Sequence, residues 1–292
     1  MTNDFENLVQ QQIQKFTTHS WREVETISAL KRLEWIRTHL SEAQIRSMRT
    51  PRQVFDLLFF SYMGLQPEDL PIVSEDEDEI VWRSVNPCPT LEACRRLGLD
   101  TRQVCRDAFE KSTQVFLSQF DPQLRFLRSY SEIRPHAGYC LERIVRVDFD
   151  ALMHLAIEEA RSAQRAGNRP FGAVVALGSR VLARAGDTSV TQDDPGLHAE
   201  VNALRGAVDA LGDSNLSGAL LMSTAEPCPA CTSLAEWTNL TGILYGVEIE
   251  EATRHDPLPL ASGAREVSQR SPVLLEVIGG VLYDECAALY AE

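Results

Sequence analysis

Two short motifs constrain this chain more than any other feature of its sequence. An H-x-E motif places His198 and Glu200 two residues apart, and a P-C-x-x-C motif beginning 29 residues after His198 supplies Cys228 and Cys231. Imidazole nitrogen and thiolate sulfur are the ligands that Zn²⁺ takes in tetrahedral protein sites. We therefore predict that His198, Cys228 and Cys231 bind one zinc ion.

Three protein ligands leave the fourth position of a tetrahedral zinc ion for water, which is typical of catalytic sites. No further His or Cys pair lies near the motifs, and the next cysteine, Cys286, stands alone. Zinc in such a site lowers the pKa of its bound water to about 7. Glu200 is not needed for coordination. We expect its carboxylate to take the proton of that water and pass it to a leaving amine.

Other interpretations of the motifs need features that the sequence lacks. A C-x-x-C pair can be a redox pair, but that requires a thioredoxin-like context, and here Pro227 and Pro229 flank Cys228. A structural zinc would require a fourth protein ligand. A pair of core cysteines would leave the H-x-E motif without a purpose.

Both motifs stand where helices are expected to begin. Asp194-Pro195 is a helix-start signal, and apolar residues follow His198 at helical spacing from Val201 to Leu211. Pro227 likewise precedes a helical run to Trp237. His198 and Glu200 are thus predicted in a first turn, and the two cysteines one turn apart. The positive end of a helix dipole favours thiolate and hydroxide at both places.

The charge is distributed unevenly along the 292 residues. Residues 1–147 carry 19 Lys or Arg and 21 Asp or Glu, a net charge of −2, whereas residues 148–292 carry nine Arg, no Lys and 21 Asp or Glu, a net charge of −12. Binding of nucleic acid depends on neutralising phosphates with Lys and Arg. The acidic half holds the zinc motifs, so we expect a small-molecule substrate and no nucleic-acid partner.

The length and the composition favour a cytoplasmic protein of two domains, 1–147 and 148–292. The first residues, MTNDFENLVQ, have no apolar signal core, and no apolar run approaches the roughly 18 residues that span a bilayer. We therefore expect no membrane association. Seven cysteines, an odd number with two in a metal motif, favour a reducing compartment.

Residues 1–147 are predicted to form a helix-rich α+β domain. Helical spacing runs from Glu23 to Leu40, Pro51 begins a helix that continues to Met63, and residues 80–85 alternate like a strand. The acidic run 75–79 is predicted as a solvated loop, with metal binding as the alternative. Three roles stay open for one group of residues, namely core packing, a thiol-lined ligand pocket or a metal site: Cys88, Cys94, Cys105, Cys140 and His136.

Residues 80–145 resemble the L-2-amino-thiazoline-4-carboxylate hydrolase-like domains. The resemblance rests on Cys88, Gly98 and Cys105, on the Asp-Pro-x-Leu-Arg-Phe segment that ends at Phe126, and on residues 138–140. It implies a helix-rich α/β module that can hold a pocket.

Residues 148–292 are predicted to form a three-layer α/β/α domain around a mixed sheet. Strand-like segments after a hairpin alternate with helical ones, which places helices on both faces of a sheet. The expected helices are 149–165, one after each zinc motif, and 281–290, and the expected strands are 171–177, 180–185, 219–223, 242–247 and 273–278.

Residues 149–292 resemble the cytidine-deaminase superfamily, in its branch with guanine deaminases and tRNA adenosine deaminases. The resemblance rests on Pro170–Val175, Asp194–Arg205, Glu226–Cys231, Tyr245-Gly246 and the tail 279–286. It implies that His198, Cys228 and Cys231 bind Zn²⁺, that Glu200 moves protons, that Phe171 and Gly172 help to wall a base pocket, and that the protein is a homodimer.

Three further residues are candidates near the substrate. The family usually has Asn where this chain has Asp187, and an ionised Asp accepts hydrogen bonds but donates none. We expect Asp187 to face a donor group of the substrate, or else to stabilise its own turn. Trp237 and Tyr290 could stack on a substrate ring, although a core position is the competing interpretation.

The leading hypothesis is hydrolytic deamination of a small amine-bearing heterocycle, such as a free nucleobase or a nucleoside related to guanine or cytosine. A tRNA adenosine deaminase is the main competitor among enzymes. A ligand-binding protein with an inactive deaminase domain is the competitor from another class, and the intact Glu200 is evidence against it.

Overall fold

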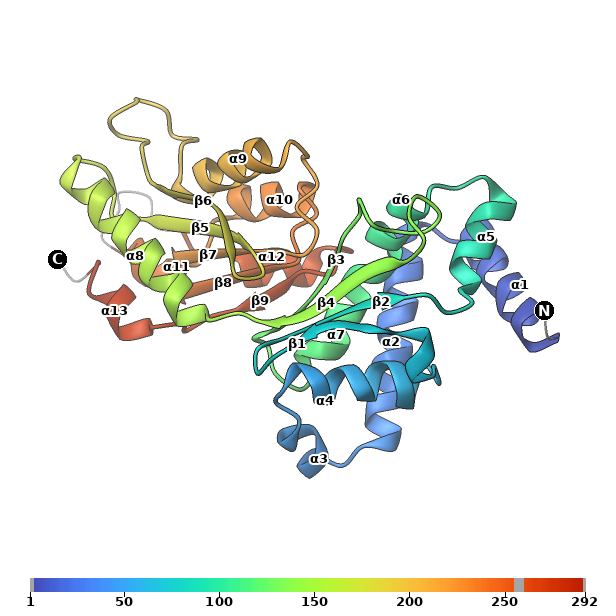
Figure 1. Cartoon of the computed structure of the whole chain (residues 1–292). Coiled ribbons are helices and arrows are strands. Elements are labelled where there is room, and N and C mark those ends of the chain that lie inside the picture. The colour runs from blue at the N-terminus through green and yellow to red at the C-terminus, as the bar shows by residue number, and fades with distance from the viewer. Residues whose placement is uncertain (1–2, 255–259, 291–292) are drawn as a thin grey trace. The chain divides into compact units, whose positions relative to one another are not determined.

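The computed structural model describes residues 3–254 and 260–290. The chain divides into two compact units, Met1–Val147 and Asp148–Glu292, and each is described by itself below (Figure 1). In the ranges that the structure describes, no helix is both long enough and apolar enough to cross a membrane.

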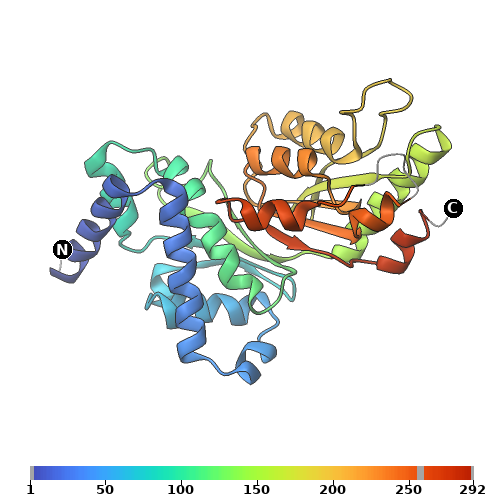
Figure 2. The same ribbon diagram turned by 180° about the vertical axis from the view of Figure 1, so that it is seen from behind.

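The first unit is built on a four-stranded antiparallel sheet with the order β1-β2-β4-β3. Helices pack on one face of this sheet, and Figure 2 shows the long helix α2 beside α7. The strands are β1 (Ile72–Glu75), β2 (Glu79–Ser84), β3 (Leu124–Arg128) and β4 (Cys140–Arg146), and the main helices are α1 (Asn3–Thr18), α2 (Trp21–His39), α3 (Glu42–Ser47), α4 (Pro51–Phe55), α5 (Pro89–Leu97), α6 (Thr101–Cys105) and α7 (Lys111–Ser118).

Aromatic side chains fill the core between these helices and the sheet. Trp82 of β2 is fully buried, and its ring lies 4.8 Å from Phe55 of α4 and 5.0 Å from Phe59, measured between ring centroids. Phe116 of α7 belongs to the same cluster. Burial of such large apolar surfaces is the main source of the unit's stability.

The predicted helix from Pro51 to Met63 is confirmed, although it changes character along its length. Thr50 caps it by accepting a hydrogen bond from the backbone N–H of Gln53. Beyond α4 the chain continues as a π-helix, η1 (Asp56–Tyr62), and a second short π-helix, η3 (Arg106–Glu110), leads into α7. Spacing alone does not distinguish these forms, because both bury one apolar face.

The sequence predicted only one strand of the four in this unit. β2 lies where residues 80–85 alternate, but β1, β3 and β4 were not predicted. The acidic run is an exposed loop between β1 and β2, as predicted, and the Asp76 carboxylate accepts hydrogen bonds from the N–H groups of Asp78 and Glu79. β1 forms a hairpin with β2, whereas β4 pairs with β2 from about 60 residues further along the chain and with β3 on its other side.

The second unit contains a five-stranded mixed sheet with the order β6-β5-β7-β8-β9. β5 is antiparallel to both β6 and β7, whereas β7, β8 and β9 are parallel. The strands are β5 (Gly172–Leu177), β6 (Arg180–Gly186), β7 (Ala219–Ala225), β8 (Gly242–Val247) and β9 (Glu276–Ile278). The predicted three-layer α/β/α fold with a mixed sheet is confirmed.

Helices cover both faces of this sheet, as Figure 1 shows. α9 (Ala199–Leu211) and α10 (Pro229–Trp237) lie on one face, over the inward side chains of Ala173, Val175 and Tyr245. α8 (Phe149–Arg165) and α13 (Tyr283–Ala287) lie on the other face. Two short helices after β8, α11 (Ile249–Ala252) and α12 (Ala264–Arg270), were not predicted, and the last helix is shorter than the predicted 281–290.

Gly172 is required where β5 crosses α8. A Cβ atom built on Gly172 would overlap the carbonyl oxygen of Ala156 and the amide nitrogen of Ala160, both backbone atoms that cannot move aside. Gly186, which pairs with Gly172 in the neighbouring strand, also meets α8 closely. The absence of side chains here lets the helix approach the sheet at the edge where the zinc motifs stand.

We predict that Gly172→Ala destabilises the protein by about 1–3 kcal/mol or prevents folding, because overpacking against backbone forces a shift of helix or strand. Urea unfolding followed by circular dichroism measures this. Gly138→Ala is the control, since no atom lies within 4 Å of a Cβ placed there and its φ needs no glycine. Equal unfolding midpoints for Gly172→Ala and wild type would contradict the packing described here.

Candidate functional site

The sheet topology brings the two motifs to one edge. β6 and β7 are both antiparallel to β5, so they run in the same direction and end at the same edge of the sheet. β6 leads through a loop to His198, and β7 leads directly to Cys228. β5 begins at this edge, where the N–H of Asp187 donates to the carbonyl of Phe171 at 3.0 Å. Residues far apart in sequence therefore surround one point.

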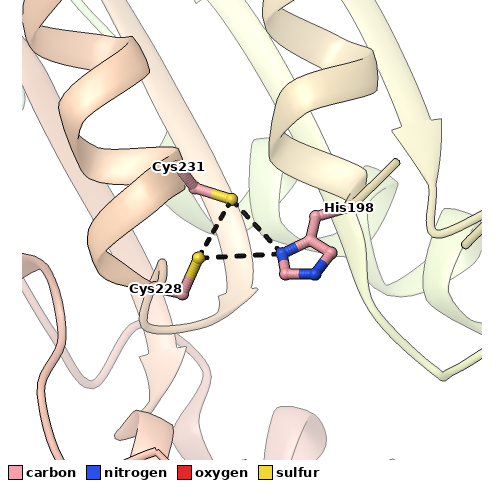
Figure 3. A group of neighbouring side chains, drawn as sticks. All are labelled: His198, Cys228 and Cys231. Atoms are coloured by element: carbon pink, nitrogen blue, oxygen red, sulfur yellow. Dashed lines mark hydrogen bonds between the residues drawn. The ribbon is translucent and has the colours of Figure 1, made fainter. Parts of the chain in front are cut away.

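His198, Cys228 and Cys231 converge there (Figure 3). Nδ1 of His198 lies 3.7 Å from Sγ of Cys228 and 3.4 Å from Sγ of Cys231, and the two sulfurs are 3.4 Å apart. His198 is the N-cap residue of α9 rather than part of its first turn, and Cys228 is the N-cap of α10. The positive ends of two helix dipoles thus point towards the cluster.

These distances fit a single zinc ion. Tetrahedral zinc with ordinary bond lengths places two sulfur ligands about 3.8 Å apart, and a sulfur and a nitrogen about 3.6 Å apart. The three atoms lie within a few tenths of an ångström of that arrangement. Throughout the ranges 3–254 and 260–290, no other group of His, Cys, Asp and Glu side chains converges in this way.

The electrostatics of the cluster favour a thiolate. The contact with Cys231, together with the nearby His198, lowers the pKa of the Cys228 thiol to about 4. The same contact and burial raise the pKa of Cys231. A divalent metal ion bound by both sulfurs favours their thiolate forms.

Glu200 lies beside the cluster and is largely removed from water, with 5% of its surface exposed. One carboxylate oxygen accepts a hydrogen bond from Ser223 of β7 at 2.9 Å, and the other lies 3.7 Å from Sγ of Cys231. Burial raises the pKa of Glu200, which makes this carboxylate a better proton acceptor than an exposed one. The carboxylate is therefore held next to the site without taking part in the three-ligand set.

A cavity opens next to His198 and Glu200, and two of the predicted substrate residues line it. Phe171 forms part of the wall, and the ring of Tyr290 packs against it at 5.4 Å between centroids. Asp187 also lines the cavity, although it is 1% exposed and its Oδ1 accepts hydrogen bonds from the N–H and the hydroxyl of Ser189. Asp187 therefore both stabilises its own turn and lines the cavity.

Two other predicted substrate residues do not reach the cavity. Gly172 is not among the residues that line it, because its position faces α8 across the sheet. Trp237 ends α10 with 80% of its surface exposed, so its alternative core position is wrong, while its predicted stacking on substrate stays a prediction that this cavity does not support. The helical spacing of Trp237 indicated an inward face, but the helix ends there and the indole turns outward.

Sequence reasoning missed several residues of the site. Glu226 lines the cavity, and its carboxylate accepts hydrogen bonds from the N–H groups of Arg265 and Ile249. These bonds hold the segment after β8 over the site, where Ile249, Thr253 and Leu260 form a wall. No periodic pattern marks that segment. Ser223 had a detectable signal, since it and Thr224 are hydroxyl residues in an otherwise apolar strand.

Comparison with known proteins places this site in a family. Residues 147–247 match the family model described as the cytidine and deoxycytidylate deaminase zinc-binding region. The chain is 40% identical over 96 residues to a tRNA-specific adenosine deaminase of Agrobacterium fabrum, covering 33% of this chain and 63% of that protein. It is 32% identical over 140 residues to the tRNA-specific adenosine deaminase of Bacillus subtilis, covering 47% of this chain and 83% of that protein.

A guanine deaminase of Bacillus subtilis is 35% identical over 83 residues, which are 28% of this chain and 53% of that protein. The chain thus spans less than two thirds of two of these three relatives, and more than two thirds of the B. subtilis tRNA-specific deaminase.

We predict that Cys228→Ser and Cys231→Ser each lose bound zinc, because a hydroxyl is a far weaker ligand than a thiolate and two remaining ligands do not hold the ion. Elemental analysis after dialysis against a mild chelator should give about one zinc per wild-type chain and near none for the variants. Cys286→Ala is the control, since this thiol packs against Gly246 in the layer of α13. Full zinc content in both Ser variants would contradict the assigned ligands.

Proposed function

Because the chain belongs to the cytidine deaminase-like superfamily, we propose that it is a zinc-dependent hydrolytic deaminase that replaces the amino group of a small heterocycle by oxygen and releases ammonia. The observation that carries this proposal is the combination of a three-ligand His/Cys/Cys cluster with a buried carboxylate, Glu200, beside it. A structural zinc site would have no use for that carboxylate.

In this proposal, Glu200 transfers protons. Zinc, when bound, acts as a Lewis acid and supplies a water that ionises near neutral pH. Glu200 accepts the proton as the C–O bond forms at the amine-bearing ring carbon, and it donates a proton to the amine as the C–N bond breaks. One water is consumed, and one oxo-heterocycle and one ammonia are formed. Ser223 orients the carboxylate through its hydrogen bond.

We propose a free nucleobase or nucleoside, related to guanine or cytosine, as the substrate. The half of the chain that contains the site carries a net charge of −12 and no lysine, which opposes phosphate binding. Thr253 and Leu260 also form a wall across the cavity, which suits a small ring better than a loop of RNA. A tRNA adenosine deaminase is the second candidate, and the identity to two tRNA-specific relatives favours it.

We also propose that the protein is a homodimer and that it is located in the cytoplasm. All seven cysteines are free thiols, which suits a reducing compartment. The dimer follows from the family resemblance, and sedimentation equilibrium tests it.

We predict that Glu200→Gln retains zinc and lowers kcat about 100-fold or more, because Gln cannot accept and return the proton. Ammonia release from a panel of purines, pyrimidines and nucleosides measures this, with Asp209→Asn as the control for an exposed acid on the same helix. Inosine formation in tRNA without ammonia release from free bases would favour the second candidate. Zinc-loaded wild type that acts on neither would favour a binding protein.

We predict that Asp187→Asn changes the substrate preference while preserving the fold. Oδ1 of Asn can still accept both hydrogen bonds from Ser189, so the turn remains, whereas an N–H donor replaces the second carboxylate oxygen. Substrates that offer an acceptor at this wall should gain in kcat/KM relative to those that offer an N–H. An unchanged ranking across the base panel would limit Asp187 to its role in the turn.

A further inference from the structure

The first unit contains a large cavity that is independent of the zinc site. It has a volume of about 540 Å³, and all its lining residues lie between Phe5 and Glu142. α1, α2 and η1 form one side of it, and the sheet and the start of α5 form the other. This volume is within the range of cavities that bind cofactors and other small organic molecules.

Positive charge dominates the wall of this cavity. Its single acidic residue, Glu142, is already engaged, because it binds Arg128 at 2.5 and 2.8 Å and accepts hydrogen bonds from Trp82 and Ser84. Considering only residues that the structure describes, no carboxylate forms an ion pair with the other basic residues of the wall, which are Lys15, Lys31, Arg32 and Arg134. Such a lining is unusual in a chain with a net charge of −14.

Polar atoms of the wall also lack partners. Nε of Arg32, one terminal nitrogen of Arg128 and Oε1 of Gln12 are buried with no hydrogen-bond partner among the described residues. A buried guanidinium N–H without an acceptor is costly, and native structures rarely retain one without a reason. The two arginine nitrogens call for an acceptor with a negative charge, and a carboxylate or phosphate oxygen is such an acceptor.

The charges of the wall also act on one another. Burial and the nearby charge of Arg128 lower the pKa of Arg32 to about 10. Burial and the charge of Lys31 lower the pKa of Lys15. An anion bound between these groups would relieve both effects. Apolar side chains also line the cavity, and Leu58, Phe59, Phe109 and Met63 are available to contact a hydrocarbon or aromatic body.

Three thiols line the same cavity without forming a reactive centre. Cys88, Cys105 and Cys140 belong to the wall, so the ligand-pocket alternative describes them better than core packing, which fits Cys94. Burial raises the pKa of Cys88, and raises that of Cys105 to about 12. Protonated thiols are poor nucleophiles, so the features of the cavity indicate reversible binding.

We propose that the cavity of the first unit is a binding site for a small organic oxyanion, that is, a carboxylate or phosphate attached to an apolar body of one or two rings. Arg32 and Arg128 bind the oxyanion through their unpartnered nitrogens. Lys15, Lys31 and Arg134 add positive charge to the wall, and the aromatic residues contact the body. This role is distinct from deamination and does not depend on it.

Calorimetric titration of the full-length, zinc-loaded protein tests the proposal. The probes are naphthalene-2-carboxylate and 2-naphthyl phosphate, and naphthalene-2-carboxamide serves as the neutral isostere. We expect at least one anion to bind about tenfold or more tightly than the amide, since charge-assisted hydrogen bonds are the strong ones. The preferred anion separates a carboxylate ligand from a phosphate ligand. Binding of the amide as tightly as both anions, or of no probe at millimolar concentration, would overturn the proposal.

Variants assign the binding to this cavity. Arg32→Gln should weaken anion binding about tenfold or more, whereas Arg37→Gln, on the same helix with its side chain 78% exposed, should not. If Arg32→Gln fails to fold, the double variant Lys15→Gln/Lys31→Gln is measured in its place and should also weaken anion binding. Cys228→Ser should bind the anion like wild type, which separates this site from the zinc cluster. Wild-type affinity in every folded cavity variant would refute the assignment.

Discussion

The convergence of two helix N-termini on one point is the constraint on which the second unit depends. His198 begins α9 and Cys228 begins α10, and both helices start at the edge where β6 and β7 end. Two thiolates packed this closely repel each other unless positive charge lies near them. The positive ends of the helices and a divalent ion balance that charge. The site and the fold are therefore stabilised together.

Around this centre, buried polar residues connect elements that the sequence separates. Ser223 joins β7 to the first turn of α9 through Glu200, and Asn202 donates from α9 to the carbonyls of Gly186 and Leu197 and to the hydroxyl of Thr188. Each bond satisfies a group that would be costly to bury alone. The loop between β6 and α9 is thereby fixed at the rim of the site.

The two units differ in how they use charge. The second unit carries nearly all of the net negative charge and concentrates its chemistry at one metal site. The first unit is close to neutral, yet it gathers basic residues around an apolar cavity. Each unit therefore presents its own electrostatic environment, acidic in the second unit and basic at the cavity of the first.

The sequence by itself indicated the His/Cys/Cys cluster, the neighbouring acid and the alternation of strands and helices in residues 148–292, because these depend on residue type at short spacing. Only the tertiary structure decided which other residues surround the site and which do not. It placed the Trp237 indole in solvent, set Gly172 against a helix and brought the segment after β8 over the cavity through Glu226. It also paired three strands of the first unit and enclosed its cavity. Those outcomes depend on contacts between residues distant in the chain, which no local pattern encodes.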